Sequence, residues 1–170
     1  MNIVAQVERA MIEYYTGDVR RINHFLKVYG FAKAIGELEG LPENEQLILE
    51  IAALTHDIGI RSSELKYHSS SGEHQQMEGP PEAEKLLSAL HVEPAVISRV
   101  CWLIAHHHTY DAIRQADYQI LVEADFLVNI HEDSLSQPAI ENIERDIFKT
   151  DTGKTFLHAL YLPDDKGKAD

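Results

Sequence analysis

The fold is decided by one stretch of sequence, Ala52-Ala53-Leu54-Thr55-His56-Asp57-Ile58-Gly59, in which an apolar run ends in two adjacent ionisable residues and a glycine. The preceding segment, residues 45–54, carries apolar side chains every three or four positions, which is typical of a helix with one buried face. His56 and Asp57 stand at the end of that face, so we expect both in the interior. Because an unpaired buried charge is costly, the pair needs a partner, either a metal ion or a hydrogen bond between the two in an ordinary core.

The totals indicate one compact domain without a nucleic-acid or membrane partner. The chain has 170 residues, 44% of them hydrophobic, and a formal charge of −13. Such an acidic chain is unsuited to a nucleic-acid duplex or an anionic membrane, whereas a small phosphorylated substrate is compatible if bound cations make its pocket positive. A homo-oligomer is compatible with the sequence. The single cysteine, Cys101, excludes an intrachain disulfide and favours a cytoplasmic location.

The periodicity of apolar residues predicts an all-α fold. No segment shows sustained alternation of apolar and polar residues, and helical spacing recurs in eight segments. These are residues 2–15, 18–39, 43–58, 82–91, 94–108, 117–133, 138–148 and 155–162. We therefore expect one domain over residues 1–170 with its core in 18–132.

Two segments lack this periodicity. Residues 60–79 are rich in Ser, Gly, His and Gln, which predicts a long loop, either a lid over the site or a disordered surface loop. Pro80-Pro81 then suits a helix start. Residues 163–170 are polar and are expected to form a flexible tail.

Further ligand-type residues fall on the buried faces of other predicted helices. His24 lies among apolar positions of the segment 18–39, and Asp125 lies beside those of 117–133. Continuing the apolar stripe of the segment from Pro94 by three and four residues reaches His107 and His108, whereas His106 falls on another side.

This set predicts a metal centre. Imidazole and carboxylate groups together suit Fe, Mn, Zn, Co or Ni, or Mg where carboxylate and water dominate. His24, His56, Asp57 and Asp125 would hold one ion, and His107 and His108 could complete a second site with Asp57 as the bridge. Two neighbouring ions would polarise a phosphoryl group and provide a hydroxide nucleophile near neutral pH.

The ordered set His24, His56-Asp57 and Asp125 resembles the signature of the HD-domain metal-dependent phosphohydrolases. The supporting stretches are His24-x3-Val28-x3-Ala32, Ala52 to Gly59, Glu78-Gly79-Pro80, His106 to Tyr110, and Glu123-Ala124-Asp125-Phe126. The resemblance extends from about residue 18 to 129. It implies an HD-type helical bundle, the four residues as ligands of the first metal, and, by analogy with branches that act on cyclic dinucleotides or diadenosine tetraphosphate, His107 and His108 as ligands of a second.

Two positions differ from the family pattern. Where branches with a second metal carry another histidine, this chain has Gln75, and the adjacent His74 is the alternative ligand. Where many relatives carry a lysine after the His-Asp pair, this chain has Ile60. A cation for the phosphate would then come from Arg20, one turn before His24, from Arg61 or from Lys66.

The leading hypothesis is a hydrolase of the HD phosphohydrolase type, acting on a small phosphate ester or nucleotide. Asp57 would hold the attacking water and an inward histidine, His107, would protonate the leaving group. Two alternatives stay open, a metal- or nucleotide-binding module without turnover and a di-iron oxygenase. The run Gly153-Lys154-Thr155 lacks the upstream glycine of a phosphate-binding P-loop and is not interpreted as one.

Overall fold

The computed structural model describes residues 2–163, and over this range the chain forms nine α-helices and no strand, which confirms the predicted all-α fold. The helices are α1 (Ile3–Tyr14), α2 (Val19–Leu38), α3 (Glu43–Thr55), α4 (Ile60–Tyr67), α5 (Gly72–Ala89), α6 (Pro94–His106), α7 (Ala116–Glu132), α8 (Gln137–Asp146) and α9 (Asp151–Tyr161). The predicted tail at 163–170 lies outside the described residues except for Pro163.

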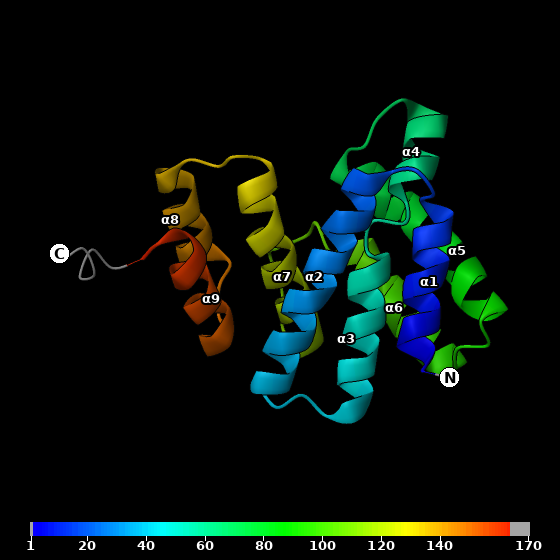
Figure 1. The fold of residues 1–170 in the computed structure, drawn as a ribbon, viewed down its shortest axis with the longest axis horizontal. Helices are drawn as coiled ribbons and strands as arrows, with labels where there is room; N and C mark the ends of the chain where they lie inside the picture. Colours follow the sequence, from blue (N-terminus) through cyan, green and yellow to red (C-terminus); the bar gives the residue numbers. More distant parts are fainter. Residues whose placement is uncertain (1, 164–170) are drawn as a thin grey trace.

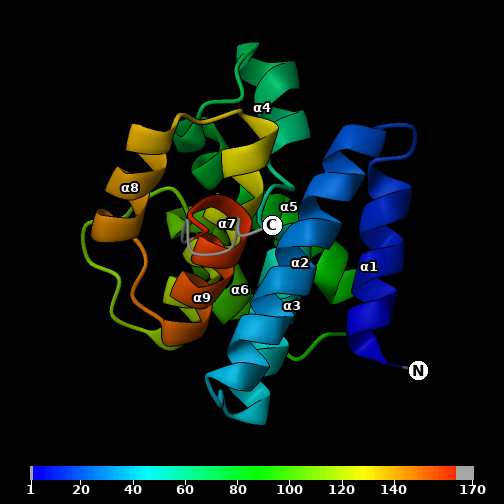
Figure 2. The same cartoon turned by 60° about the vertical axis from the view of Figure 1, so that its left-hand side comes forward.

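The central helices are α2, α3, α6 and α7. Helix α2 packs on α3 and α7, and α3 also contacts α6 and α7 (Figure 1). Helix α1 covers α3, α5 packs along α6, and α9 contacts α7 and α2 (Figure 2). The helices that carry or precede the residues of the predicted centre therefore pack in one contiguous bundle.

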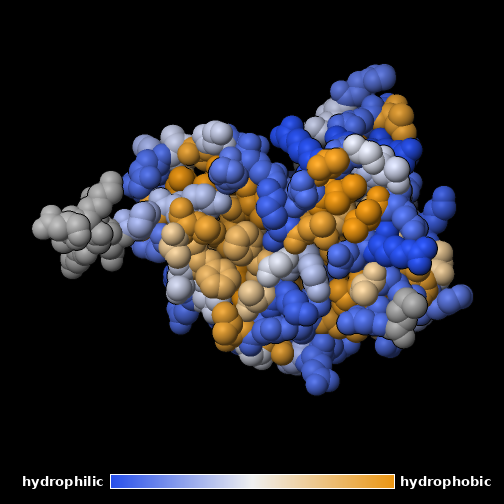
Figure 3. Space-filling model, viewed as in Figure 1, coloured by the Kyte–Doolittle hydropathy of each residue, from blue (hydrophilic) through white to orange (hydrophobic). Residues whose placement is uncertain are grey.

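The core is continuous and apolar. In α3 every residue from Ile48 to Thr55 is buried, and on α2 the side chains at helical spacing Phe25, Val28, Ala32 and Ile35 are at most 1% exposed. Figure 3 shows apolar side chains in separate patches of the visible surface, divided by polar ones. None of the described helices is long and apolar enough to cross a membrane.

The prediction of a long loop over residues 60–79 is wrong. Most of this segment is helical, in α4 and the first turns of α5, and only a short turn separates them. His68 ends α4 in the left-handed region at φ 51°, and the Ser71 side chain accepts a hydrogen bond from the backbone N–H of His74 at the start of α5. The start predicted at Pro80-Pro81 is also wrong, because both prolines lie inside α5.

The composition of the buried face explains this error. The buried positions of α5 include Gln75, Glu78 and Gly79 as well as the apolar Ala83 and Leu87. These positions recur every three or four residues, as in a helix with one buried face. Because several of them are polar or glycine, the spacing of apolar residues alone does not reveal the helix. Helix α5 therefore buries one face along its whole length, although the first half of that face is not apolar in the sequence.

Candidate metal centre

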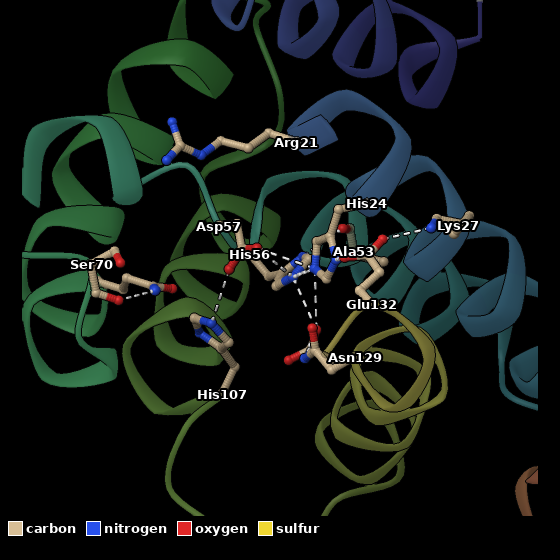
Figure 4. A network of polar contacts seen from close by, with 12 residues as sticks. Arg21, His24, Lys27, Ala53, His56, Asp57, Ser70, His107, Asn129 and Glu132 are labelled. Atoms are coloured by element: carbon tan, nitrogen blue, oxygen red, sulfur yellow. Dashed lines mark hydrogen bonds and ion pairs between the residues drawn. The ribbon is translucent and has the colours of Figure 1, made fainter. Parts of the chain in front are cut away.

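Four polar side chains from three parts of the bundle lie close together, and Figure 4 shows three of them, His24, His56 and Asp57. His24 comes from α2, His56 and Asp57 from the turn that follows α3, and Asp125 from α7. His24 Nε2 lies 3.3 Å from His56 Nε2, 3.2 Å from Asp57 Oδ2 and 3.3 Å from Asp125 Oδ1. His56 Nε2 lies 3.3 Å from Asp57 Oδ2 and 3.5 Å from Asp125 Oδ1.

These separations fit a set of metal ligands. Two ligand atoms at about 2.1 Å from one ion and at right angles to each other lie about 3 Å apart. The other ring nitrogens are held as metal-binding histidines require. His24 Nδ1–H donates to Glu132 Oε2 at 2.9 Å, and His56 Nδ1–H donates to the Ala53 carbonyl at 2.8 Å. Both Nε2 atoms are thereby directed to the common point, where each could bind an ion on losing its proton.

A second group shares Asp57 with the first. One ligand atom from each of Asp57, His107 and His108 lies within 4.8 Å of the others, as is also true of His24, His56 and Asp57. His107 Nε2 is 3.6 Å from Asp57 Oδ1, and its Nδ1–H donates to the Ile104 carbonyl at 2.8 Å. Among the described residues this buried Nε2 has no hydrogen-bond partner, which a metal ion would satisfy.

Gln75 is the neighbour of this second group. Its Oε1 accepts a hydrogen bond from His108 Nε2 at 3.0 Å, and its Nε2 donates to the Ser70 carbonyl at 2.7 Å. This contact fixes the tautomer of His108 and leaves Nδ1 as the nitrogen with a free lone pair. His74, the alternative ligand, is not brought to the centre: its ring stacks on Tyr67 at 4.2 Å.

The two carboxylates make the centre a site for positive charge. Burial opposes ionisation of Asp57, but the facing histidines His56, His107 and His24 outweigh it and hold its pKa well below the usual range. The pKa of Asp125 is lowered in the same way, against burial, by His24 and His56.

The pKa values of the imidazoles shift in opposite directions. Burial alone would lower the pKa of His24, but hydrogen bonds to Asp125 and Asp57 raise it to about 11. Against burial, Asp57 and Asp125 likewise raise the pKa of His56 to about 10. Burial and the neighbouring His107 instead lower the pKa of His108 to about 4, so His108 is neutral at pH 7.

A cavity of about 650 Å³ opens beside the centre, between α2, α4, α7 and the start of α5. Arg20 is exposed and lines this cavity, where it has no hydrogen-bond or ion-pair partner among the described residues. Its neighbour Arg21 also lines the cavity but is bound to Asp18 at 3.0 Å and to Glu64 at 2.5 Å.

The other two predicted cations are directed elsewhere. Arg61 donates to the Tyr14 carbonyl at 3.1 Å and lies over the Tyr14 ring, so it does not line the cavity. Lys66 forms an ion pair with Glu78 at 2.5 Å and is likewise absent from the cavity wall. Arg20 is therefore the one candidate of the three that the structure places at the site.

Two positions on α7 that contact the ligand cluster were missed in the sequence. Glu132 holds His24 and forms an ion pair with Lys27 at 2.6 Å, and Asn129 Nδ2 donates to Asp125 Oδ1 at 2.9 Å. Both residues line the cavity. Their spacing carried a signal, because Asn129 and Glu132 follow Asp125 by four and seven residues and thus share its helix face.

Comparisons with known proteins show the family and the fold of the chain. A family model described as HD domain matches residues 21–152. A search of curated proteins found no match. Among solved structures, the fold is similar to the crystal structure of a predicted HD superfamily hydrolase from an uncultured Thermotogales bacterium, with a TM-score of 0.66 and 23% identity over 92% of this chain and 84% of that one.

Proposed function

The chain belongs to the HD-domain family, and on this basis we propose that it is a metal-dependent phosphohydrolase acting on a small phosphate ester, nucleotides included. The observation that carries the proposal is the pair of ligand groups that share Asp57, with the buried Nε2 of His107 left without a hydrogen bond among the described residues. Divalent ions bound there would polarise phosphoryl oxygens and lower the pKa of water.

Side chains of the protein would position the attacking water, bind the phosphate and orient the histidines. Asp57 belongs to both ligand groups and holds the attacking water in line. Arg20, exposed at the cavity wall, binds the phosphate. Glu132 and Gln75 act on the histidines, because each fixes the tautomer of the ring that it contacts.

His107 would have one of two roles, which depend on the number of ions. With two ions, His107 and His108 are ligands. With one ion, His107 in its imidazolium form would carry a proton on Nε2, 3.6 Å from Asp57 Oδ1, and would pass it to the leaving oxygen, while Nδ1–H stays on the Ile104 carbonyl.

The proposal is tested with protein purified without chelator. Elemental analysis gives metal atoms per chain, and release of inorganic phosphate is measured from a panel of phosphomonoesters, dinucleoside polyphosphates and cyclic nucleotides. We expect Asp57→Ala to lose bound metal and activity together, whereas Asp146→Asn, in an exposed ion pair with Arg145, should keep both. Full turnover by Asp57→Ala would overturn the mechanism.

Gln75 favours one second candidate, a binding module without turnover. An amide stands 3.0 Å from His108, where a further histidine would complete the second site. That candidate predicts metal-dependent melting and tight binding of a phosphorylated ligand, with no phosphate released from any member of the panel.

A further inference from the structure

The cavity beside the ligand groups is strongly acidic, but most of its charges are already engaged. Six carboxylates and two guanidinium groups line it. The engaged groups are Asp57 and Asp125 in the ligand cluster, Glu132 with His24 and Lys27, and Arg21 with Asp18 and Glu64. Two exposed side chains of opposite charge remain, Arg20 and Asp133, and among the described residues neither has a hydrogen-bond or ion-pair partner.

Asp133 stands at an unfavourable position for a carboxylate. It is the C-cap of α7, directly after Glu132. The carbonyl end of a helix carries partial negative charge and favours cations, so two acidic residues there repel both the helix end and each other. Such a group gains by meeting a hydrogen-bond donor or a positive charge supplied from outside the chain.

The cavity offers no stacking surface for a nucleobase. Among its described lining residues there is no Phe, Tyr or Trp, and Ile60 is the one aliphatic side chain. The two imidazoles in the wall are already in contact with other rings, His24 with His56 at 5.3 Å and His108 with His107 at 3.9 Å between ring centroids. A single unpaired guanidinium, at Arg20, also suits one phosphate group better than a polyphosphate chain.

From this arrangement, and resting on the proposed function, we infer that the substrate is a small phosphomonoester whose organic part carries hydroxyl or ammonium groups. Its phosphate lies at Arg20 and the ligand groups, and its donors face Asp133. A nucleotide held through its base is the alternative that this lining disfavours.

Ribose 5-phosphate and adenosine 5′-monophosphate form a matched pair for the test, because they differ only at C1 of the ribose, which carries a hydroxyl in the first and adenine in the second. A stacked base would favour the nucleotide by about 5- to 150-fold. We expect kcat/KM of the metal-loaded protein to be equal for the two compounds or higher for ribose 5-phosphate. Calorimetry on chelator-treated protein gives the same comparison as a ratio of Kd values. A tenfold preference for the nucleotide in either measurement, or no binding of either compound by either form, overturns the inference.

Asp133→Asn tests the contact with the donors. Loss of a charge-assisted hydrogen bond should lower the ratio of kcat/KM for ribose 5-phosphate to that for p-nitrophenyl phosphate by about tenfold. The exposed Asp146→Asn serves as the control and should keep the wild-type ratio. An unchanged ratio in Asp133→Asn contradicts the inference.

Phosphoethanolamine in the same assay distinguishes an ammonium partner from hydroxyl partners. A preference for it over ribose 5-phosphate that Asp133→Asn abolishes assigns the ammonium. Failure of the proposed function is recognised separately, because then no phosphomonoester at all releases phosphate, while the calorimetric comparison still decides the substrate class.

Discussion

Gly59 and Gly79 are in backbone contact: a Cβ atom on Gly59 would lie 2.6 Å from the backbone nitrogen of Gly79. The same Cβ would lie 2.7 Å from the carbonyl oxygen of Gln75. The turn that carries Asp57 therefore rests directly on α5. Gly79 in turn faces Ile104, since a Cβ there would overlap Ile104 Cγ2. Close packing at these two glycines thus stacks the segments that supply Asp57, Gln75 and His107.

Gly59→Ala should therefore damage both the fold and the metal centre. The added methyl group meets backbone atoms, which cannot rotate away, so we expect a loss of about 1–3 kcal/mol in the free energy of unfolding and fewer metal atoms per chain. Thermal melting and elemental analysis measure the two effects. Gly30→Ala is the matched control, because nothing lies within 4 Å of its Cβ and alanine favours the middle of α2. Equal melting temperatures for the two variants would contradict this packing argument.

Arg20 and Arg21 should differ in their effect on substrate binding although they are adjacent. The guanidinium of Arg21 is occupied by Asp18 and Glu64, whereas Arg20 is unpaired among the described residues that line the cavity. We expect Arg20→Ala to raise KM for a phosphomonoester by about tenfold or more, the worth of a charge-assisted hydrogen bond. Arg21→Ala should raise it less. Steady-state kinetics on both variants measures the two KM values. A larger increase in Arg21→Ala than in Arg20→Ala would assign phosphate binding to Arg21 instead.

The sequence predicted those parts of the centre that follow from apolar periodicity. His24, His56 and Asp125 could be placed inward because their helices carry regular apolar stripes. The segment 60–79 could not, since apart from Ile60 its buried residues are polar or glycine, namely Ser63, Gln75, Glu78 and Gly79. Packing of a polar or glycine face depends on what lies opposite, here the turn at Gly59, and one segment's sequence does not contain that information.

The packing of Gly153 against Glu123 likewise explains the glycine of the run Gly153-Lys154-Thr155. A Cβ on Gly153 would overlap Glu123 Oε2. Glu123 is fully buried on α7, and its Oε1 accepts hydrogen bonds from the backbone N–H groups of Lys149 at 2.7 Å and Thr150 at 3.0 Å. The glycine of the Gly153-Lys154-Thr155 run thus makes room for a carboxylate that anchors the start of α9.

Glu123→Gln should therefore destabilise the protein without changing the chemistry of the centre. A glutamine keeps one oxygen for the backbone N–H groups of Lys149 and Thr150, but its NH₂ group then faces the Thr150 hydroxyl, which donates to Glu123 Oε2 in the wild type. That hydroxyl loses its acceptor and the charge of the carboxylate is lost, at a cost of about 1–3 kcal/mol. We expect a drop in melting temperature of about 2–4 °C for each kcal/mol, with metal content per folded chain unchanged. Differential scanning calorimetry together with elemental analysis tests both parts. A wild-type melting temperature would show that Glu123 is not an anchor of α9.

Metal removal should lower stability through the same carboxylates that bind the ion. Asp57 and Asp125 both contact His24 in the buried cluster. A ligand that binds only the folded state stabilises it by about 2.7 kcal/mol at a concentration of 100 Kd. Chelator should lower the melting temperature, and readdition of the metal found by elemental analysis should restore it. The Asp57→Ala variant lacks the residue that both ligand groups share, so chelator should not change its melting temperature. If this variant lost as much stability on chelation as the wild type, the stabilising ion would be bound elsewhere in the protein.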